Sequence, residues 1–334
     1  MDQEELMLEL PGQRRVDDQE QSDPDLEKVR KWFLNQKDCG QRFGAVIRKS
    51  MDEVLDGQRT GRYDLYRTGK GRVEKTEKTY LGTKVEIVAR DEFDLGYGES
   101  MDYSISGIEV DAKWTIGKTW TIPKEAMGHI CLVMRGDDRT GRFGVGLVRI
   151  TQELLNLGEN GDRKRTISAA QKKQICWIVE DGSLPDNLLL SLERRNPKKL
   201  SSIFEGSAGF GGSRNGGQRR VSALFKSFPG ELVDRTTVVT VARQEDGPKR
   251  VRDARKALWS DGYVILGHLK PHLRIAMDLG LPVPRKGSWV SARLALIAED
   301  DSRPSTVIDG RRYGIWREGD ACTPAPVVGN QSES

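Results

Sequence analysis

Hydrophobic residues in the first half of the chain recur with two different periods, and the change of period predicts helices followed by strands. Segments 24–33 and 41–55 place apolar side chains three and four residues apart, the spacing of one helical face, and Asp23 is a suitable cap for the first. Predicted strands follow at 83–90, 103–116, 129–136 and 142–150. Predicted helices return at 151–157 and 168–182. Helices around a mixed sheet indicate an α/β domain of roughly 160 residues.

The composition of the chain changes after Gly182. A leucine-rich helix within 182–199 ends in a basic break, and a glycine-rich stretch follows at 205–220. These glycines fit neither a GK[ST] nor a GxGxxG register, so they do not predict a phosphate-binding loop. The stretch is instead predicted to be a flexible connector.

The second half contains the order of elements that is typical of a winged helix-turn-helix. Asp234 can cap a helix at 235–244, a turn follows, and a second helix is predicted at 248–262. Two hydrophobic strands then occupy 263–269 and 288–298. Helix, turn, basic helix and β-hairpin together predict a domain that contacts DNA.

The helix predicted at 248–262 has an apolar face and an opposite basic face. Such a basic face is often only solvated, and this is the simpler alternative. The hairpin that follows favours DNA contact. The predicted DNA-binding residues are Lys249, Arg250, Arg252, Arg255 and Lys256.

Length and charge change this picture only in part. The chain has 334 residues, more than one compact core usually needs, so two domains are expected. The net charge is +4, but the first 25 residues are acidic, so the remainder is more basic than the total suggests. This distribution favours a polyanionic partner.

Cysteine and hydropathy patterns predict a soluble cytoplasmic protein. The 4 cysteines form no CxxC pair, which argues against a disulfide framework and a zinc ribbon. No apolar run approaches membrane-spanning length, and the acidic N-terminus differs from a signal peptide.

The chain has 3 histidines, which leaves little for mechanisms that need several of them. His268 and His272 are four residues apart, but Pro271 between them disfavours a shared helical face. A turn or core role is therefore expected for this pair in place of a metal site.

The most informative polar group lies within the strands predicted at 103–116. Period two places Asp111 and Lys113 on the same face of one strand, while the alternate residues are apolar. Asp102 lies nine residues before Asp111, beyond a short turn. A second D-x-K stretch begins at Asp162 in a polar loop and lacks this strand context.

Two carboxylates that converge on one point repel each other unless a divalent cation lies between them. Hard oxygen ligands suit Mg²⁺, which can bind a phosphate oxygen and activate a water molecule. Neighbouring carboxylates stabilise an ammonium group, so Lys113 is expected to orient the water and stabilise charge more than to act as the base. The alternative is an ion pair on an exposed sheet face.

These residues resemble the PD-(D/E)xK nuclease site, and most of the chain resembles the NaeI-type restriction endonucleases. The resemblance rests on segment 77–87, on the spacing D-Y-x6-V-D-x-K from Asp102 to Lys113, and on segment 249–267. Met101 stands where the general motif has proline, and Arg59 stands where a topoisomerase-like stretch of the family has leucine.

The resemblance implies an α/β restriction-endonuclease-like domain with a mixed sheet flanked by helices, joined to a C-terminal winged helix-turn-helix domain similar to the catabolite activator. It implies Mg²⁺-dependent homodimers that bind two copies of double-stranded DNA, one cut and one acting as activator, at a GC-rich palindrome related to GCCGGC. A DNA methyltransferase would belong to the same system. The catalytic glutamate, two aspartates and lysine would be Glu86, Asp102, Asp111 and Lys113, the first three also holding the metal.

The expected organisation follows from both arguments. The predicted parts are a flexible acidic tail at 1–22, an endonuclease domain at 23–180, a linker at 181–187, a winged-helix domain at 188–325 and a tail at 326–334.

Two other functions use part of these features. A transcriptional regulator with a non-cleaving nuclease-like domain would need only the winged helix. A topoisomerase-like strand transferase would need a tyrosine nucleophile, and no tyrosine of the first half lies in an arginine-rich catalytic context.

Overall fold

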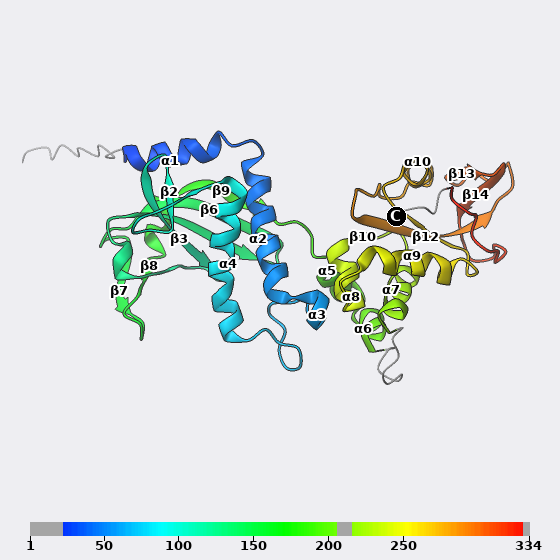
Figure 1. The fold of residues 1–334 in the computed structure, drawn as a ribbon, viewed down its shortest axis with the longest axis horizontal. Coiled ribbons are helices and arrows are strands. Elements are labelled where there is room, and N and C mark those ends of the chain that lie inside the picture. Colours follow the sequence, from blue (N-terminus) through cyan, green and yellow to red (C-terminus); the bar gives the residue numbers. More distant parts are fainter. Residues whose placement is uncertain (1–22, 206–215, 330–334) are drawn as a thin grey trace, which may run out of the picture.

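The structure is a computed structural model that describes residues 23–205 and 216–329. The predicted tail at 1–22, most of the glycine-rich connector and the end of the second tail lie outside the described residues. Figure 1 shows two bodies that lie side by side along the long axis, with the N-terminal body on the left.

The N-terminal body is built on a six-stranded sheet with the order β1-β2-β3-β5-β6-β9. Its strands are β1 (Gly96–Tyr97), β2 (Tyr103–Ile105), β3 (Ile108–Thr115), β5 (Ile130–Asp137), β6 (Arg142–Arg149) and β9 (Cys176–Ser183). β3 and β5 are parallel, and the other neighbours are antiparallel. The mixed sheet agrees with the α/β prediction.

Helices cover one face of this sheet and a small sheet covers the other. The helices of this body are α1 (Pro24–Leu34), α2 (Cys39–Leu55), α3 (Gly57–Thr60) and α4 (Lys75–Phe93), and a short 3-10 turn η1 (Lys124–Ala126) precedes β5. The small sheet has the order β4-β8-β7, with β4 (Thr121–Ile122), β7 (Leu155–Glu159) and β8 (Arg165–Ile167). Successive side chains of β5 point to opposite faces of the central sheet and contribute to both cores. Leu132 and Met134 pack toward the helices, whereas Cys131 and Val133 pack toward the small sheet.

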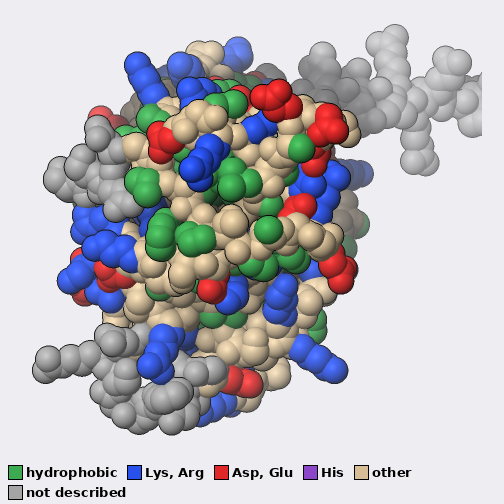
Figure 2. Space-filling model, turned by 90° about the vertical axis from the view of Figure 1, so that its right-hand side faces the viewer, with side chains coloured by type: hydrophobic (Ala, Val, Ile, Leu, Met, Phe, Trp, Pro, Cys, Tyr) green, Lys and Arg blue, Asp and Glu red, His purple; other side chains and the backbone are tan. Residues whose placement is uncertain are grey.

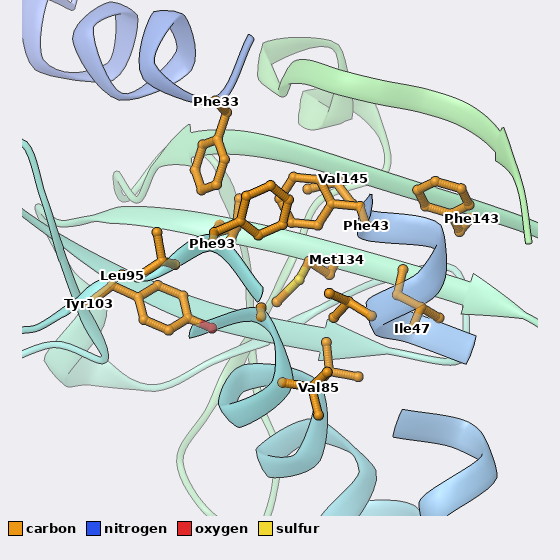
Figure 3. Close-up of a cluster of buried hydrophobic side chains, with 14 of the residues drawn as sticks. Phe33, Phe43, Ile47, Val85, Phe93, Leu95, Tyr103, Met134, Phe143 and Val145 are labelled. Atoms are coloured by element: carbon orange, nitrogen blue, oxygen red, sulfur yellow. The ribbon is translucent and has the colours of Figure 1, made fainter. Parts of the chain in front are cut away.

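The helical side holds the larger core. Phe33 of α1, Phe43 of α2 and Phe93 of α4 meet there, with ring centroids 4.4 to 5.6 Å apart. Figure 3 shows these rings above Met134 of the central sheet. Burial of large apolar side chains of this kind is the main stabilising contribution in such a layer.

Three predicted elements were wrong. Segment 83–90 is part of the long helix α4, because Leu81, Val85 and Val88 at spacings of four and three form its buried face. Segment 151–157 contains a turn and the start of β7. Segment 168–182 is the 3-10 turn η2 (Ala170–Gln174) followed by the edge strand β9, which pairs with β6.

The C-terminal body begins with α5 (Leu188–Arg195), after β9 has run to Ser183. Its other helices are α6 (Pro197–Glu205), α7 (Gly216–Ser227), α8 (Arg235–Ala242), α9 (Gly247–Leu258) and α10 (Lys270–Asp278). Its strands are β10 (Leu232–Asp234), β11 (Tyr263–Leu266), β12 (Ser288–Leu296), β13 (Ser305–Ile308) and β14 (Arg311–Ile315). β10 and β11 both pair antiparallel with β12, and the far end of β12 pairs with β14.

The two bodies contact each other near the segment that follows α3. Tyr63, from the N-terminal half, is buried among the helices of the C-terminal body and stacks on Phe204 with ring centroids 5.7 Å apart. Asn187 caps α5 and donates from Nδ2 to the carbonyl of Tyr63 at 2.8 Å and to Asp138 Oδ2 at 3.0 Å. A cavity of about 850 Å³ remains between α2 and α8, away from the predicted catalytic carboxylates.

Candidate active site

The predicted catalytic residues come from three neighbouring elements. Glu86 lies on α4, Asp102 directly precedes β2, and Asp111 and Lys113 lie on β3. A cavity of about 310 Å³ is lined by Glu86, Asp102 and Lys113 among others. The structure therefore brings together residues that are up to 27 positions apart, from Glu86 to Lys113.

The D-x-K pair has the geometry that its strand period predicts. Lys113 Nζ lies 2.5 Å from Asp111 Oδ2 and donates to the carbonyl oxygen of Ala112 at 3.1 Å. Asp111 is buried, and the Cys131 thiol beneath it donates to Asp111 Oδ2 at 3.7 Å. Burial raises the pKa of Cys131, so this thiol keeps its proton and remains a donor.

Asp102 is held against the centre of this pair. Its Oδ2 accepts a hydrogen bond from the backbone N–H of Ala112 at 2.7 Å. Burial, followed by a hydrogen bond with the Asp111 side chain, raises the pKa of Asp102 to about 6. The two carboxyl groups are therefore close enough to oppose each other's ionisation.

Arg90 holds Glu86 beside Asp102. Arg90 Nη2 donates to Glu86 Oε1 at 2.9 Å and to the carbonyl oxygen of Asp102 at 3.1 Å. The Tyr103 hydroxyl donates to the carbonyl oxygen of Glu86 at 2.9 Å. Burial and the negative charge of Asp102 raise the pKa of Glu86, while Arg90 opposes this shift.

Two residues that organise the site were missed in the sequence. Arg90 stands four residues after Glu86, a helical spacing that is meaningful only once the segment is known to be a helix. Glu109 accepts hydrogen bonds from the backbone N–H groups of Glu99, Ser100 and Met101, each at 2.9 Å. These bonds lower the pKa of Glu109 to about 2 and fix the loop that leads to Asp102.

The donor set suits a hard divalent cation. Asp102 and Asp111 offer adjacent carboxylate oxygens, and their mutual repulsion would be relieved by a cation. The carboxylate of Glu86 forms an ion pair with Arg90, and that of Asp111 forms an ion pair with Lys113. Within residues 23–205 and 216–329, no three acidic, histidine or cysteine side chains gather closely enough to hold a metal ion by themselves.

The two histidines of the predicted turn or core pair differ in position: His268 is exposed in a bend before α10, and His272 has the core role. His272 is buried near the start of α10, and its Nδ1 accepts the backbone N–H of Gly267 at 2.9 Å. Pro271 lies in the first turn of that helix.

The residues predicted to bind DNA divide into two groups on α9. Lys249 and Lys256 are exposed, and Arg252 is half-buried. Arg250 lies 3.6 Å from Asp253, and Arg255 Nε donates to the carbonyl oxygen of Ile265 at 2.8 Å. Of these residues, Lys249 and Lys256 are therefore the more accessible to an external phosphate.

One end of the C-terminal body carries charges of both signs. Figure 2 shows Lys and Arg side chains around the margin of this face, with Asp and Glu among them and small hydrophobic groups between. A surface with charges of both signs attracts a long polyanion such as DNA less strongly than a uniformly basic surface does.

Comparisons with known proteins agree with the resemblance seen in the sequence. The family described as "Restriction endonuclease NaeI" matches residues 27–324. The chain is 39% identical over 332 residues to the "Type II restriction enzyme NaeI" of Lentzea aerocolonigenes, a match that covers 98% of this chain and 99% of that protein. None of the helices in the described part of the chain combines the length and apolar character needed to cross a bilayer. Match length and identity together place the chain in the NaeI restriction endonuclease family.

Proposed function

We propose that this protein is a type II restriction endonuclease that hydrolyses phosphodiester bonds of double-stranded DNA at a specific site. The single observation that carries the proposal is the convergence of Glu86, Asp102 and Lys113 on one cavity, with Asp111 bonded behind them. Membership of the NaeI family supports the same reaction.

The roles of the side chains follow from their chemistry. Asp102 and Asp111 are the metal ligands, with Glu86 as the third acidic residue, and Lys113 orients the attacking water and stabilises charge on the phosphate. Mg²⁺ bound there would supply a Lewis acid for the phosphate and lower the pKa of a bound water. The water oxygen forms the new bond to phosphorus as the bond to the 3′ oxygen breaks, which leaves a 5′-phosphate and a 3′-hydroxyl.

The C-terminal body is proposed to be a winged helix that binds a second DNA copy as activator. The order α7, β10, α8, α9, β11, β12, with β12 between β10 and β11, supports this reading. The predicted hairpin is longer than a simple wing, because α10 lies between β11 and β12. A homodimer, a target related to GCCGGC and a companion methyltransferase complete the proposal.

A plasmid digest tests the central claim. Supercoiled plasmid carrying several candidate sites is incubated with Mg²⁺ or with EDTA, using the wild type and Asp111→Ala. Discrete Mg²⁺-dependent fragments with the wild type, absent with the variant, are expected. Retained DNA binding without any cutting by either protein would replace the proposal with a non-cleaving transcriptional regulator.

A further inference from the structure

The second D-x-K stretch of the sequence ends at the active-site cavity. Its lysine, Lys164, lines the same 310 Å³ cavity as Glu86, Asp102 and Lys113. Lys164 comes from the hairpin between β7 and β8, whereas Glu86 comes from α4. Figure 1 places this hairpin and α4 on either side of β3.

The hairpin holds Lys164 through its backbone. Asn160 Oδ1 accepts from the backbone N–H groups of Asp162 at 3.0 Å and Lys164 at 2.9 Å. The Asn160 N–H donates in return to the Lys164 carbonyl oxygen at 2.9 Å. The hairpin is joined to the rest of the domain by the pairing of Thr166 with Thr121. These hydrogen bonds therefore fix the backbone position of Lys164.

The neighbouring basic residue is used differently. Arg165 donates to Gln152 Oε1 and to the Asn156 carbonyl oxygen, both at 2.6 Å. Its guanidinium group thus holds the hairpin together. Lys164 is exposed, and within the described residues its ammonium group lies within 4.0 Å of no carboxylate. Its charge is therefore available at the cavity that Glu86 and Asp102 also line.

We propose that Lys164 is a positioning residue that binds a non-bridging phosphate oxygen of the DNA strand in the active site. A flexible ammonium group acts as a point charge toward phosphate, and Lys164 lines the same cavity of about 310 Å³ as Glu86, Asp102 and Lys113. Lys113 then contacts the scissile phosphate from the strand side, and Lys164 contacts the backbone from the hairpin side. This inference rests on the proposed function.

The test compares Lys164→Ala and Lys164→Arg with the control Lys173→Ala. Lys173 is exposed in the same domain and does not line the cavity. Each protein is checked for folding by thermal unfolding. The cut site is mapped from the fragment ends that the wild type produces, and a synthetic duplex that spans the intact site is used. Its binding is measured without Mg²⁺ over a range of salt concentrations, and its single-turnover cleavage is measured with Mg²⁺.

Lys164→Ala is expected to cut roughly 10- to 100-fold more slowly, because a displaced phosphate reacts poorly. The slope of log affinity against log salt should fall by about 0.9, the value for one phosphate contact. Lys164→Arg should recover most of both losses, and Lys173→Ala should match the wild type.

Duplexes with one uncharged methylphosphonate at each position near the cut give the sharpest readout. The wild type should lose affinity at the phosphate that Lys164 contacts, whereas Lys164→Ala should lose nothing further there. Equal losses at every position, or wild-type cleavage by a folded Lys164→Ala, overturn the inference while leaving the nuclease function intact. A wild type that cuts no DNA overturns the proposed function, and the inference with it.

Discussion

Asp102 accepts a hydrogen bond from the backbone N–H of Ala112 at 2.7 Å. Ala112 is the middle residue of the D-x-K stretch. This bond therefore holds Asp102, at the end of the loop before β2, against the part of β3 that carries Asp111 and Lys113. The distance between the two carboxylates is therefore set by the strand, and their repulsion is built into the fold.

Asp102→Asn should separate activity from stability. The amide oxygen can still accept the Ala112 N–H, but the negative charge is lost, so cleavage should fall roughly 100- to 1000-fold. Stability at pH 7 should stay equal or rise, because a repulsive carboxylate has been removed. Asp162→Asn is the matched control, an exposed aspartate of the other D-x-K stretch. A destabilised but active Asp102→Asn would contradict the assignment.

Glu109→Gln should slow cleavage through the loop that carries Asp102. The three backbone N–H groups that donate to the Glu109 carboxylate would keep only a neutral amide oxygen as acceptor. Loss of such an orienting group costs roughly 10- to 100-fold in comparable sites. Single-turnover rates of Glu109→Gln and of the exposed neighbour Glu99→Gln provide the comparison. Equal rates for the two variants would remove the orienting role.

Sequence alone identified the strand chemistry but could not choose Glu86 without the family resemblance. Asp111 and Lys113 are two residues apart, and any extended strand brings them to one face. The pattern at 83–90, where Val85 and Ile87 alternate with polar residues, favours a strand around Glu86. The structure exposes Ile87 and buries Val85 on a helix, so tertiary packing overrode the local β preference.

The same limit applies to β9 and to the hairpin of Lys164. The predicted helix at 168–182 contains Trp177 and Val179, which pack as an edge strand only because β6 lies beside them. Lys164 could not be connected with the catalytic residues, since its position depends on the pairing of β8 with β4. Contacts between distant segments are not encoded in any local period.

The raised pKa of Asp52, which lines the cavity between α2 and α8, predicts that the stability of the protein depends on pH. Burial, with the charges of Asp234 and Asp138 adding to it, raises the pKa of Asp52 to about 6 although Arg48 opposes the shift. Between about pH 4 and 6, the Asp52 carboxyl is therefore protonated in the folded protein and ionised in the unfolded chain. The free energy of unfolding consequently falls as the pH rises through this range.

Asp52→Asn should remove this part of the pH dependence. Relative to the wild type, the variant should gain roughly 1–2 kcal/mol between about pH 4 and 7, a value discounted for the partial exposure of Asp52. Chemical unfolding of both proteins at several pH values measures the difference. A difference that does not change with pH would show that Asp52 titrates normally.

Arg48 should be among the most sensitive polar positions for stability. Its Nη1 lies 2.5 Å from Asp138 Oδ1, both side chains are buried, and Asp138 also accepts from Asn187. Arg48→Ala leaves a buried carboxylate without its partner and should cost about 3–5 kcal/mol.

The exposed pair of Arg142 and Asp181 is the control for this prediction. Their atoms are also 2.5 Å apart, but the side chains are 44% and 60% exposed. Arg142→Ala should therefore cost at most about 1 kcal/mol. Equal losses in the two variants, measured by denaturant unfolding, would mean that burial does not decide the strength of these pairs.

The last prediction concerns α9 and the proposed activator site. Lys249 and Lys256 are exposed on this helix, so Lys249→Ala and Lys256→Ala should each lower the salt slope of DNA binding by about 0.9. The acceleration of plasmid cleavage by an added short duplex should fall toward none in the double variant, with a smaller effect on the rate without added duplex. Lys198→Ala, an exposed lysine of α6, should keep the full acceleration. If the double variant is activated as strongly as the wild type, the second DNA copy does not bind through α9, and the winged-helix proposal loses its main functional consequence.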